Sequence, residues 1–434
     1  MGTLGTGSST RIGCKGPGIS DHAPCTTAQC PGARAVFFGL DCQYVWSVRS
    51  EQSGWFLRLG LGPNLAQMDW FLSVLVLPHQ PASIGWGISL SAFGGEASIQ
   101  LGMIMFKLLV STVVVTGFLS MTVVAQEFDV QGHRGARGLA PENTLAAFAR
   151  ALTIGVSTLE FDVGISSDSI VVVTHNPRLE PETTRRSDGT WLSATGPAIR
   201  TLSIKDLGAY DVGRIKPGSR YAERFSNQTP ADGSRIPTLK EVIELVLRSG
   251  NEKVRLNIEA KLDPTKPDLT HGPEKFASAI LDVVLQAGMT SRVTIQSFDW
   301  RVLQEVQRRA PKVETSYLTV QQRWLDNLRI GEAGPSPWTA GFDIDNFDGS
   351  IPRLVKAAGG RVWSPYHREI NPAQVKEAHD LDLTVKVWTV SEEKRMKALI
   401  EMDVDGIITD YPDRLRRVLE MRGMNLPTPT PVQP

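Results

Sequence analysis

The chain has 434 residues, with 46 Lys and Arg against 46 Asp and Glu, so its formal net charge is zero. This balance argues against a broad nucleic-acid-binding surface. The length is enough for two or three average domains, or for one large barrel with additional segments.

Residues 1–102 differ in composition from the rest of the chain. All four cysteines lie there, at positions 14, 25, 30 and 42, and residues 1–125 contain only six Lys or Arg and five Asp or Glu. The cysteine spacings do not match a zinc site of paired Cys-x-x-Cys motifs. The segment also lacks regular apolar periodicity. Because a signal-like stretch follows only at residues 103–125, we interpret residues 1–102 as a non-native or unstructured extension from an over-extended gene model, with translation starting at Met103 or Met105.

Residues 103–125 have the pattern of a secretory signal peptide. Lys107 precedes an apolar stretch over residues 108–124, which ends in Val-Val-Ala. A basic start, an apolar core and small residues before a cleavage point are typical of such a signal. We therefore expect a mature protein that begins near Gln126, is periplasmic or secreted, and has no stable membrane partner. A membrane anchor is the alternative, because the stretch is only marginally too short to span a bilayer.

From residue 126 onward, strand-like apolar runs alternate with helix-like periods, which predicts a parallel α/β fold. The candidate strands are Phe128–Gly132, Thr158–Ile165, Ile170–His175, Val254–Lys261, Val293–Phe298, Val313–Val320, Arg361–Pro365, Leu383–Thr389 and Gly406–Thr409. The candidate helices are Leu145–Ile154, Leu239–Arg248, Lys275–Ala287, Trp300–Arg309, Ile351–Ala358, Pro372–Leu381 and Glu392–Met402.

About eight strand–helix units in residues 126–434 suit a (β/α)₈ TIM barrel. Residues 176–236, rich in Pro, Gly, Ser and charges, are the expected insertion after the second barrel strand region. A doubly wound open sheet is the alternative fold, but no Gly-x-Gly-x-x-Gly follows a strand and precedes a helix.

The segment from Gly132 to Thr144 combines one histidine, two arginines and several glycines before a helix-start signal. Glycine permits tight turns and close approach to a ligand. Arginine offers planar donors to phosphate, and histidine can transfer a proton near neutral pH. The segment is either a site for a phosphorylated substrate or a basic surface turn.

Three carboxylates lie near strand ends, namely Glu160, Asp162 and Glu259, the last with Lys261 two positions later. Residues two apart on a strand point to the same side. Carboxylates without cysteine favour a hard divalent cation, Ca²⁺ or Mg²⁺, over zinc. They could also be solvated strand-end charges.

Two histidines end predicted strands, His133 and His175. One could take a proton from an attacking oxygen while the other protonates a leaving oxygen, as a phosphodiester requires. Each could instead be a structural hydrogen-bonding residue, the interpretation kept for His271, His367 and His379.

Residues 128–420 resemble the glycerophosphodiester phosphodiesterase family. The matching motifs are His133-Arg134-Gly135, Pro141-Glu142-Asn143-Thr144, Glu160-x-Asp162, His175, Glu259-x-Lys261, Gln296-Ser297-Phe298, Val387-Trp388-Thr389-Val390 and Asp405-Gly406-Ile407-Ile408-Thr409-Asp410. The resemblance implies a TIM barrel that hydrolyses a small-molecule glycerophosphodiester to glycerol 3-phosphate and an alcohol.

The resemblance also implies roles for the matching residues. Glu160, Asp162 and Glu259 would bind the metal, His133 and His175 would form the acid/base pair, Arg134 and Lys261 would hold the phosphate, and Trp388 would line the glycerol end of the pocket. Trp388 could equally be a core aromatic. Glu142 could be an additional metal ligand, while Asn143 is expected mainly to support the site. Attack by the glycerol 2-hydroxyl, giving a cyclic phosphate, and direct attack by water remain open.

Two positions depart from the family pattern. Asn176 follows His175 where the family more often has Asp, and Ser391 stands where Asn is common. Two other functions are possible: a lysophospholipase D-like or phospholipase-like phosphodiesterase, and a binding protein on an inactive barrel. The polar composition of residues 176–236 argues against the first, and the complete set of chemical residues argues against the second.

Overall fold

The computed structural model describes residues 44–51, 54–61, 71–77, 85–91 and 127–434. The chain divides into two units, residues 1–123 and 124–434, which are considered separately. The predicted signal peptide, residues 103–125, lies outside the described residues. Within the described part of the chain, no helix combines the length and the apolar character needed to cross a membrane.

The N-terminal unit contains an antiparallel sheet in which neighbouring strands follow one another along the chain. Its strands are β1 (Tyr44–Glu51), β2 (Gly54–Leu61), β3 (Phe71–Leu77) and β4 (Gly85–Ser91). The sheet is not predicted from the sequence, because Gly, Ser and Arg interrupt the apolar pattern of most of these strands. The boundary at residue 102 stays a prediction.

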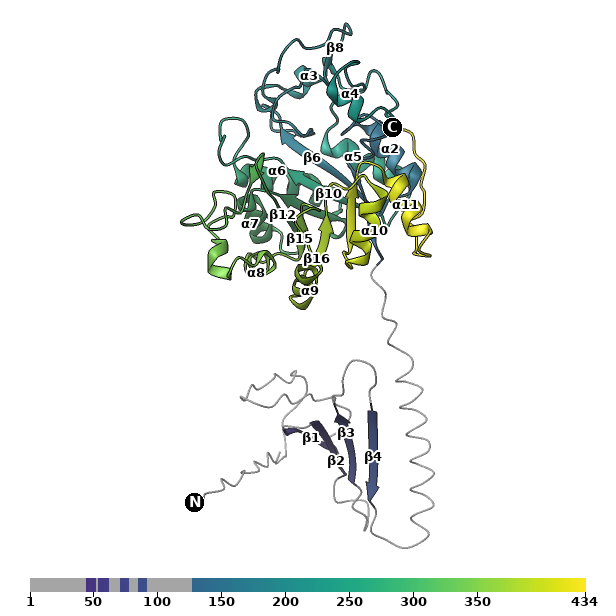
Figure 1. Cartoon of the computed structure of the whole chain (residues 1–434), viewed down its shortest axis with the longest axis vertical. Coiled ribbons are helices and arrows are strands. Elements are labelled where there is room, and N and C mark those ends of the chain that lie inside the picture. Colours follow the sequence, from purple (N-terminus) through teal and green to yellow (C-terminus); the bar gives the residue numbers. More distant parts are fainter. Residues whose placement is uncertain (1–43, 52–53, 62–70, 78–84, 92–126) are drawn as a thin grey trace, which may run out of the picture. The chain divides into compact units, whose positions relative to one another are not determined.

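The C-terminal unit is a closed barrel of eight parallel strands (Figure 1). In chain order they are β5 (Asp129–His133), β6 (Thr158–Ile165), β10 (Arg255–Ala260), β11 (Val293–Ser297), β12 (Glu314–Thr319), β15 (Val362–Pro365), β16 (Thr384–Val387) and β17 (Gly406–Thr409). Each strand pairs with the next, and β17 pairs with β5 to close the barrel. The predicted TIM barrel is confirmed.

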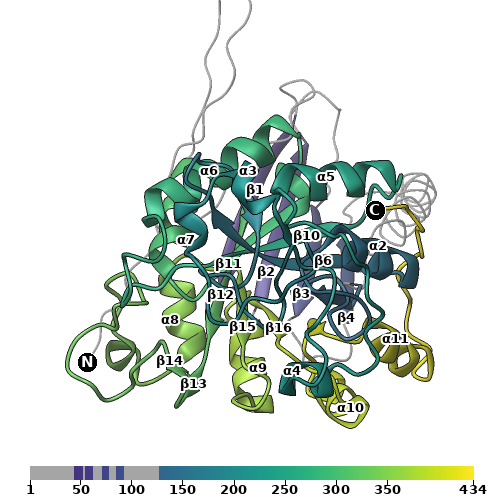
Figure 2. The same ribbon diagram turned by 90° about the horizontal axis from the view of Figure 1, so that it is seen from above.

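Helices surround the strands, as the view in Figure 2 shows. They are α2 (Leu145–Ile154), α5 (Leu239–Arg248), α6 (Pro273–Gln286), α7 (Trp300–Arg309), α8 (Ile351–Ala357), α9 (Pro372–Asp380), α10 (Glu393–Glu401) and α11 (Pro412–Glu420). Short 3₁₀ turns occur at Ile199–Thr201, Thr290–Arg292 and Ile344–Phe347. All of these helices except α11 are among those predicted from the sequence.

Apolar side chains between strands and helices form the core. On β6, Leu159 and Phe161 are fully buried, and α5 buries Val242 and Val246 at helix spacing. Each such side chain contributes about 1.5–3 kcal/mol when it is fully removed from water. Side chains alternate along a strand, so on β6 the residues between these apolar ones point into the barrel. These inward-pointing residues are polar, as Glu160 between Leu159 and Phe161 shows.

The segment between β6 and α5 contains β7 (Val171–Val173), β8 (Arg185–Arg186), α3 (Ile204–Leu207), β9 (Tyr210–Asp211) and α4 (Arg220–Arg224). Strand β7, predicted as Ile170–His175, pairs antiparallel with β6 and is not part of the closed barrel. A separate apolar cluster holds this segment together: Val172, Leu179, Leu192, Ile199, Leu207 and Ile236. In Figure 1 these elements gather beyond the tip of β6.

Candidate active site

The turn after β5 brings the first functional groups to the carboxyl end of the barrel. Arg134 has a positive φ of 50°, and Gly135 follows with φ 84°. A Cβ at position 135 would lie 2.6 Å from the backbone of Ala147, so only glycine fits. The left-handed backbone of a non-glycine residue costs of order 1–3 kcal/mol and is typical of functional sites. Thr144 then caps α2 by accepting a hydrogen bond from the Ala147 amide.

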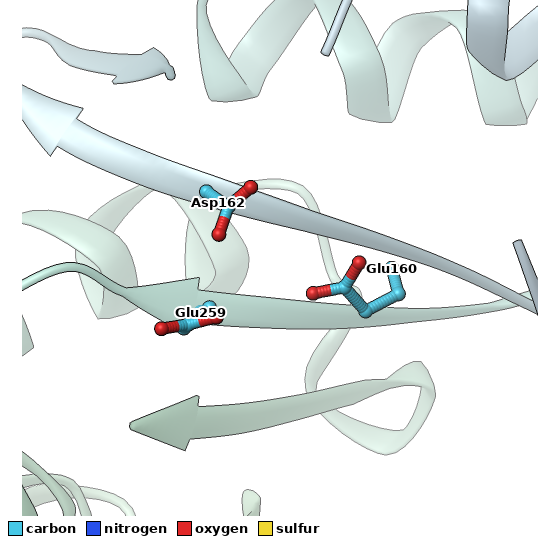
Figure 3. Close-up of side chains that lie close together, drawn as sticks. All are labelled: Glu160, Asp162 and Glu259. Atoms are coloured by element: carbon cyan, nitrogen blue, oxygen red, sulfur yellow. The ribbon is translucent and has the colours of Figure 1, made fainter. Parts of the chain in front are cut away.

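Three carboxylates converge from two neighbouring strands, Glu160 and Asp162 from β6 and Glu259 from β10 (Figure 3). One oxygen from each lies within 4.8 Å of the others. Asp162 and Glu259 are register partners across the two strands. Asp162 Oδ1 is buried and has no hydrogen-bond partner among the described residues. The arrangement matches the oxygen donor set that a hard divalent cation requires.

Burial opposes ionisation of this group, and repulsion among the carboxylates adds to that effect. Burial, together with Asp162 and Glu259, raises the pKa of Glu160 well above its ordinary value. Burial also raises the pKa of Glu259 to about 7, although Lys261 opposes the shift. Burial opposes ionisation of Asp162 too, but Arg134, His175 and Lys261 hold its pKa below the usual range. A bound cation would relieve this repulsion.

Two basic side chains neighbour the carboxylates. Lys261 Nζ lies 2.7 Å from Glu259 Oε1 and 3.7 Å from Asp162 Oδ1. Arg134 Nε lies 3.2 Å from Asp162 Oδ2, and its backbone N–H donates to Glu160 Oε2 at 3.1 Å. Both basic groups can therefore face the same ligand as the three carboxylates.

His133 is held by a buried carboxylate. Its Nδ1 lies 2.7 Å from Asp410 Oδ1, and Arg137 donates to both oxygens of Asp410, at 2.7 and 3.1 Å. Ser391 adds a hydroxyl donor to Asp410 at 3.2 Å. Since the carboxylate accepts, His133 Nδ1 carries the proton and Nε2 is left free. Burial, followed by Arg137, lowers the pKa of His133 to about 4.

His175 has a neutral partner instead. Its Nδ1 lies 2.6 Å from Asn176 Oδ1, an oxygen that accepts, so Nε2 is again free. Burial, Arg134 and Lys261 hold the pKa of His175 well below its ordinary value. Both histidines are therefore neutral near pH 7 in this structure, each with an unprotonated Nε2.

These side chains line a cavity of about 1080 Å³ at the carboxyl end of the barrel. The lining includes His133, Arg134, Glu160, His175, Glu259, Lys261 and Trp388. Asp162 lies directly behind it, within the carboxylate group. The structure thus brings all eight sequence-predicted site residues to one place.

Comparison with known proteins agrees with this geometry. Residues 133–414 match the model of the glycerophosphoryl diester phosphodiesterase family. The chain belongs to this family. A glycerophosphodiester phosphodiesterase of Caldanaerobacter subterraneus is 26% identical over 294 residues, which cover 68% of this chain and 98% of that protein. One of Bacillus altitudinis is also 26% identical, covering 66% of this chain and 96% of the relative.

A solved structure shows the same architecture. It is a candidate glycerophosphoryl diester phosphodiesterase from Silicibacter pomeroyi, 36% identical, with a TM-score of 0.61. The match covers 69% of this chain and 96% of that one. The family's fold therefore occupies the C-terminal unit.

Within the family barrel, Glu142 does not join the carboxylate group. Its Oε1 accepts from Arg134 Nη1 at 2.6 Å, and its Oε2 accepts from the hydroxyl of Tyr221 in α4. Asn143 supports the group by donating to Asp162 Oδ2 at 3.0 Å. The structure therefore favours contact with the arginine over the metal-ligand role that the sequence suggested for Glu142.

Trp388, His367 and His379, which were also named from the sequence, differ in whether they line the cavity. Trp388 lines the cavity and also packs on Phe298, with ring centroids 5.3 Å apart. His367 lines the same cavity and accepts from Arg395 at 3.3 Å. His379 lies away from this cavity and pairs with Asp405 at 2.9 Å. Arg137 and Asp410 received no role from the sequence, although Arg137 lies in the segment from Gly132 to Thr144 and Asp410 ends a matching motif. Tyr221 lies in no matching motif.

Proposed function

We propose that this enzyme hydrolyses glycerophosphodiesters to sn-glycerol 3-phosphate and an alcohol, with His133 and His175 as the acid/base pair. The observation that carries the proposal is the convergence of the carboxylate group with both histidines around one cavity. Membership of the family makes phosphodiester hydrolysis the reaction class.

A divalent cation, Ca²⁺ or Mg²⁺, fits the group formed by Glu160, Asp162 and Glu259. Within the described residues, Asp162 Oδ1 is a buried acceptor without a donor, and burial together with repulsion by Asp162 and Glu259 raises the pKa of Glu160. When bound, such a cation supplies Lewis-acid polarisation of the phosphate and neutralises charge that develops on its oxygens.

Arg134 and Lys261 would hold the remaining phosphate oxygens and stabilise the charge of a pentavalent phosphorus. The unprotonated Nε2 atoms of His133 and His175 can each take a proton, and each imidazolium can return one. One histidine would deprotonate the attacking oxygen, while the other would first take a proton from solvent on Nε2 and then deliver it to the leaving oxygen. Attack by the substrate's 2-hydroxyl and attack by water both use this pair.

The full-length chain should release glycerol 3-phosphate from glycerophosphocholine or glycerophosphoethanolamine, measured by a coupled dehydrogenase assay. Activity should disappear with a chelator and return with Mg²⁺ or Ca²⁺. The absence of glycerol 3-phosphate from both substrates, with either cation added, would refute the proposal.

Three variants separate the roles. His133→Ala and His175→Ala should each remove turnover by about 10²–10⁴-fold, the usual contribution of a general acid or base, with cation affinity nearly unchanged. Glu160→Ala should instead weaken cation binding itself. Isothermal calorimetry with the cation alone distinguishes the two classes.

A lysophospholipid is the second candidate substrate, and one observation favours it. The insertion contributes little apolar surface to the cavity. Segments outside the insertion contribute the apolar and aromatic residues Leu269, Trp324, Leu325, Tyr366 and Ile370. Trp324 is 62% exposed at this mouth. These side chains could contact an acyl chain. Release of choline from lysophosphatidylcholine faster than from glycerophosphocholine would establish this activity.

We also propose that the enzyme is exported and that its mature chain begins near Gln126. The proposal rests on the signal-like composition of residues 103–125. Sequencing the N-terminus of the native protein tests it: a start at Met1 would refute it, and an uncleaved segment in the membrane fraction would support an anchor instead.

A further inference from the structure

The interior of the barrel contains a continuous chain of hydrogen bonds that leads to the carboxylate group. Gln131 Nε2 donates to Asp129 Oδ2 at 2.9 Å, and Asn257 Nδ2 donates to Gln131 Oε1 at 2.8 Å. Asn257 Nδ2 also donates to Gln296 Oε1 at 2.9 Å, and Gln296 Nε2 donates to Glu160 Oε1 at 2.8 Å. We call these five residues the interior hydrogen-bond chain.

All members of the chain are buried. Gln131, Asn257 and Gln296 are each no more than 2% exposed. The first member, Asp129, is fixed by Lys386, whose Nζ lies 2.8 Å from Asp129 Oδ2, and by the Thr158 hydroxyl at 2.7 Å. A buried polar network of this kind fixes side-chain orientation, because an unpaired member costs about 1–3 kcal/mol.

The two ends determine the direction of every amide between them. Asp129 and Glu160 are carboxylates, which accept hydrogen bonds when ionised. Gln131 must therefore point its NH₂ group towards Asp129, and Gln296 must point its NH₂ group towards Glu160. Both glutamines then present carbonyl oxygens to Asn257, which donates to both of them from its NH₂ group. In this orientation Asn257 Oδ1 is buried and, among the described residues, has no hydrogen-bond partner.

We propose that Gln296 and Asn257 are positioning residues for the cation site, acting by holding the Glu160 side chain in a fixed orientation. This inference rests on the proposed function, since it assumes that Glu160 binds the cation. Glu160 Oε1 receives the Gln296 amide and Oε2 receives the Arg134 backbone N–H, so both oxygens have a donor. Donors of this kind orient ligands and support their charge next to metal sites.

The decisive variant is Asn257→Asp in the full-length chain. The new carboxylate cannot donate, so Gln296 would turn its NH₂ group towards it and face Glu160 with a carbonyl oxygen. Charge alone predicts the opposite, because an added negative group in the interior attracts a cation. The interior hydrogen-bond chain predicts cation binding about tenfold weaker, and Gln296→Met, which removes the donor, about 10–100-fold weaker.

Ser316→Ala is the matched control. Ser316 is 1% exposed, and its hydroxyl is buried without a hydrogen-bond partner within the described residues. It belongs to neither the carboxylate group nor the interior hydrogen-bond chain, so its removal should leave cation affinity unchanged.

Calorimetric titration of each purified variant with Mg²⁺ and with Ca²⁺ measures the effect without turnover, and thermal unfolding verifies that each variant is folded. If Asn257→Asp does not fold, Gln296→Met decides. Wild-type affinity in Gln296→Met would overturn the inference and leave the proposed activity standing. A wild-type protein that binds neither cation would overturn the inference and the proposed cation site together.

Discussion

Tyr221→Phe tests whether the insertion controls Arg134, the arginine proposed to hold the phosphate. Tyr221 in α4 donates its hydroxyl to Glu142, whose other oxygen accepts from Arg134 at 2.6 Å. The same helix region contacts Arg137, whose guanidinium lies 4.8 Å from the centre of the Phe225 ring. Arg134 is only 8% exposed, so few positions are open to its guanidinium.

The expected size of the effect can be worked out from these contacts. A hydrogen bond to a charged group contributes about 1.5–3 kcal/mol, and Arg134 keeps its second carboxylate, Asp162, at 3.2 Å. We therefore expect about half of that energy, about 0.75–1.5 kcal/mol, to be lost from substrate binding, which lowers kcat/KM by about 3–13-fold. Cation affinity should not change, because Glu142 lies outside the carboxylate group.

Steady-state kinetics with glycerophosphocholine and calorimetry with the cation alone supply the two readouts. Tyr210→Phe is the control, since Tyr210 also lies in the insertion and, within the described residues, its hydroxyl makes no side-chain hydrogen bond. An unchanged kcat/KM in Tyr221→Phe, or an equal loss in Tyr210→Phe, would refute the reasoning.

Two further predictions concern charge. In Asn176→Asp, a carboxylate 2.6 Å from His175 Nδ1 should raise the pKa of that histidine by about one to three pH units, measured by NMR titration; no upward movement would contradict the assigned contact. Lys386→Met should lower the free energy of unfolding near neutral pH by about 3–5 kcal/mol, because it leaves the buried Asp129 carboxylate unpaired. Burial opposes ionisation of Asp129 and Lys386 lowers its pKa, so the stabilisation exists above the ordinary pKa of about 4 and is lost as the pH falls. The difference between wild type and variant in urea unfolding should therefore shrink in acid, and Asp129→Asn in the same chain should recover stability; a constant difference would count against the pair.

Much of the barrel could be predicted because its strands are short apolar runs and its helices carry one apolar face. Helices α2, α5 and α7 begin and end where the periodicity predicted. Strand β7 shows the limit: three valines in succession indicate a buried strand, but its direction depends on pairing with β6, which local sequence does not encode. Helix α11 was missed although its apolar residues recur at helix spacing.

Site residues could be predicted where a reactive side chain lies near the end of a predicted strand. They could not be predicted where their contacts come from segments distant in the sequence. Glu160 and Asp162 are two apart on one strand, so their shared side follows from the sequence. Tyr221 reaches Glu142 from 79 residues away, and Asn257 lies on β10 between Arg255 and Glu259 with no local pattern that marks its partners. Only the closed barrel reveals that Asn257 joins Gln131 to Gln296.

The ion pairs at the site link cation binding to phosphate binding. In the structure, Lys261 pairs with Glu259 and Arg134 contacts Asp162, so the groups proposed to hold phosphate neutralise the proposed cation ligands. With all of them ionised, three carboxylates face two basic side chains, which leaves one excess negative charge that repels a phosphodiester. A bound divalent cation would reverse that sign by binding the same carboxylates, and Arg134 and Lys261 would then be able to contact the substrate. We therefore expect the phosphodiester to bind after the cation. Without the cation, Lys261 stays paired with Glu259 and Arg134 with Asp162, and these ion pairs compete with the contacts to phosphate.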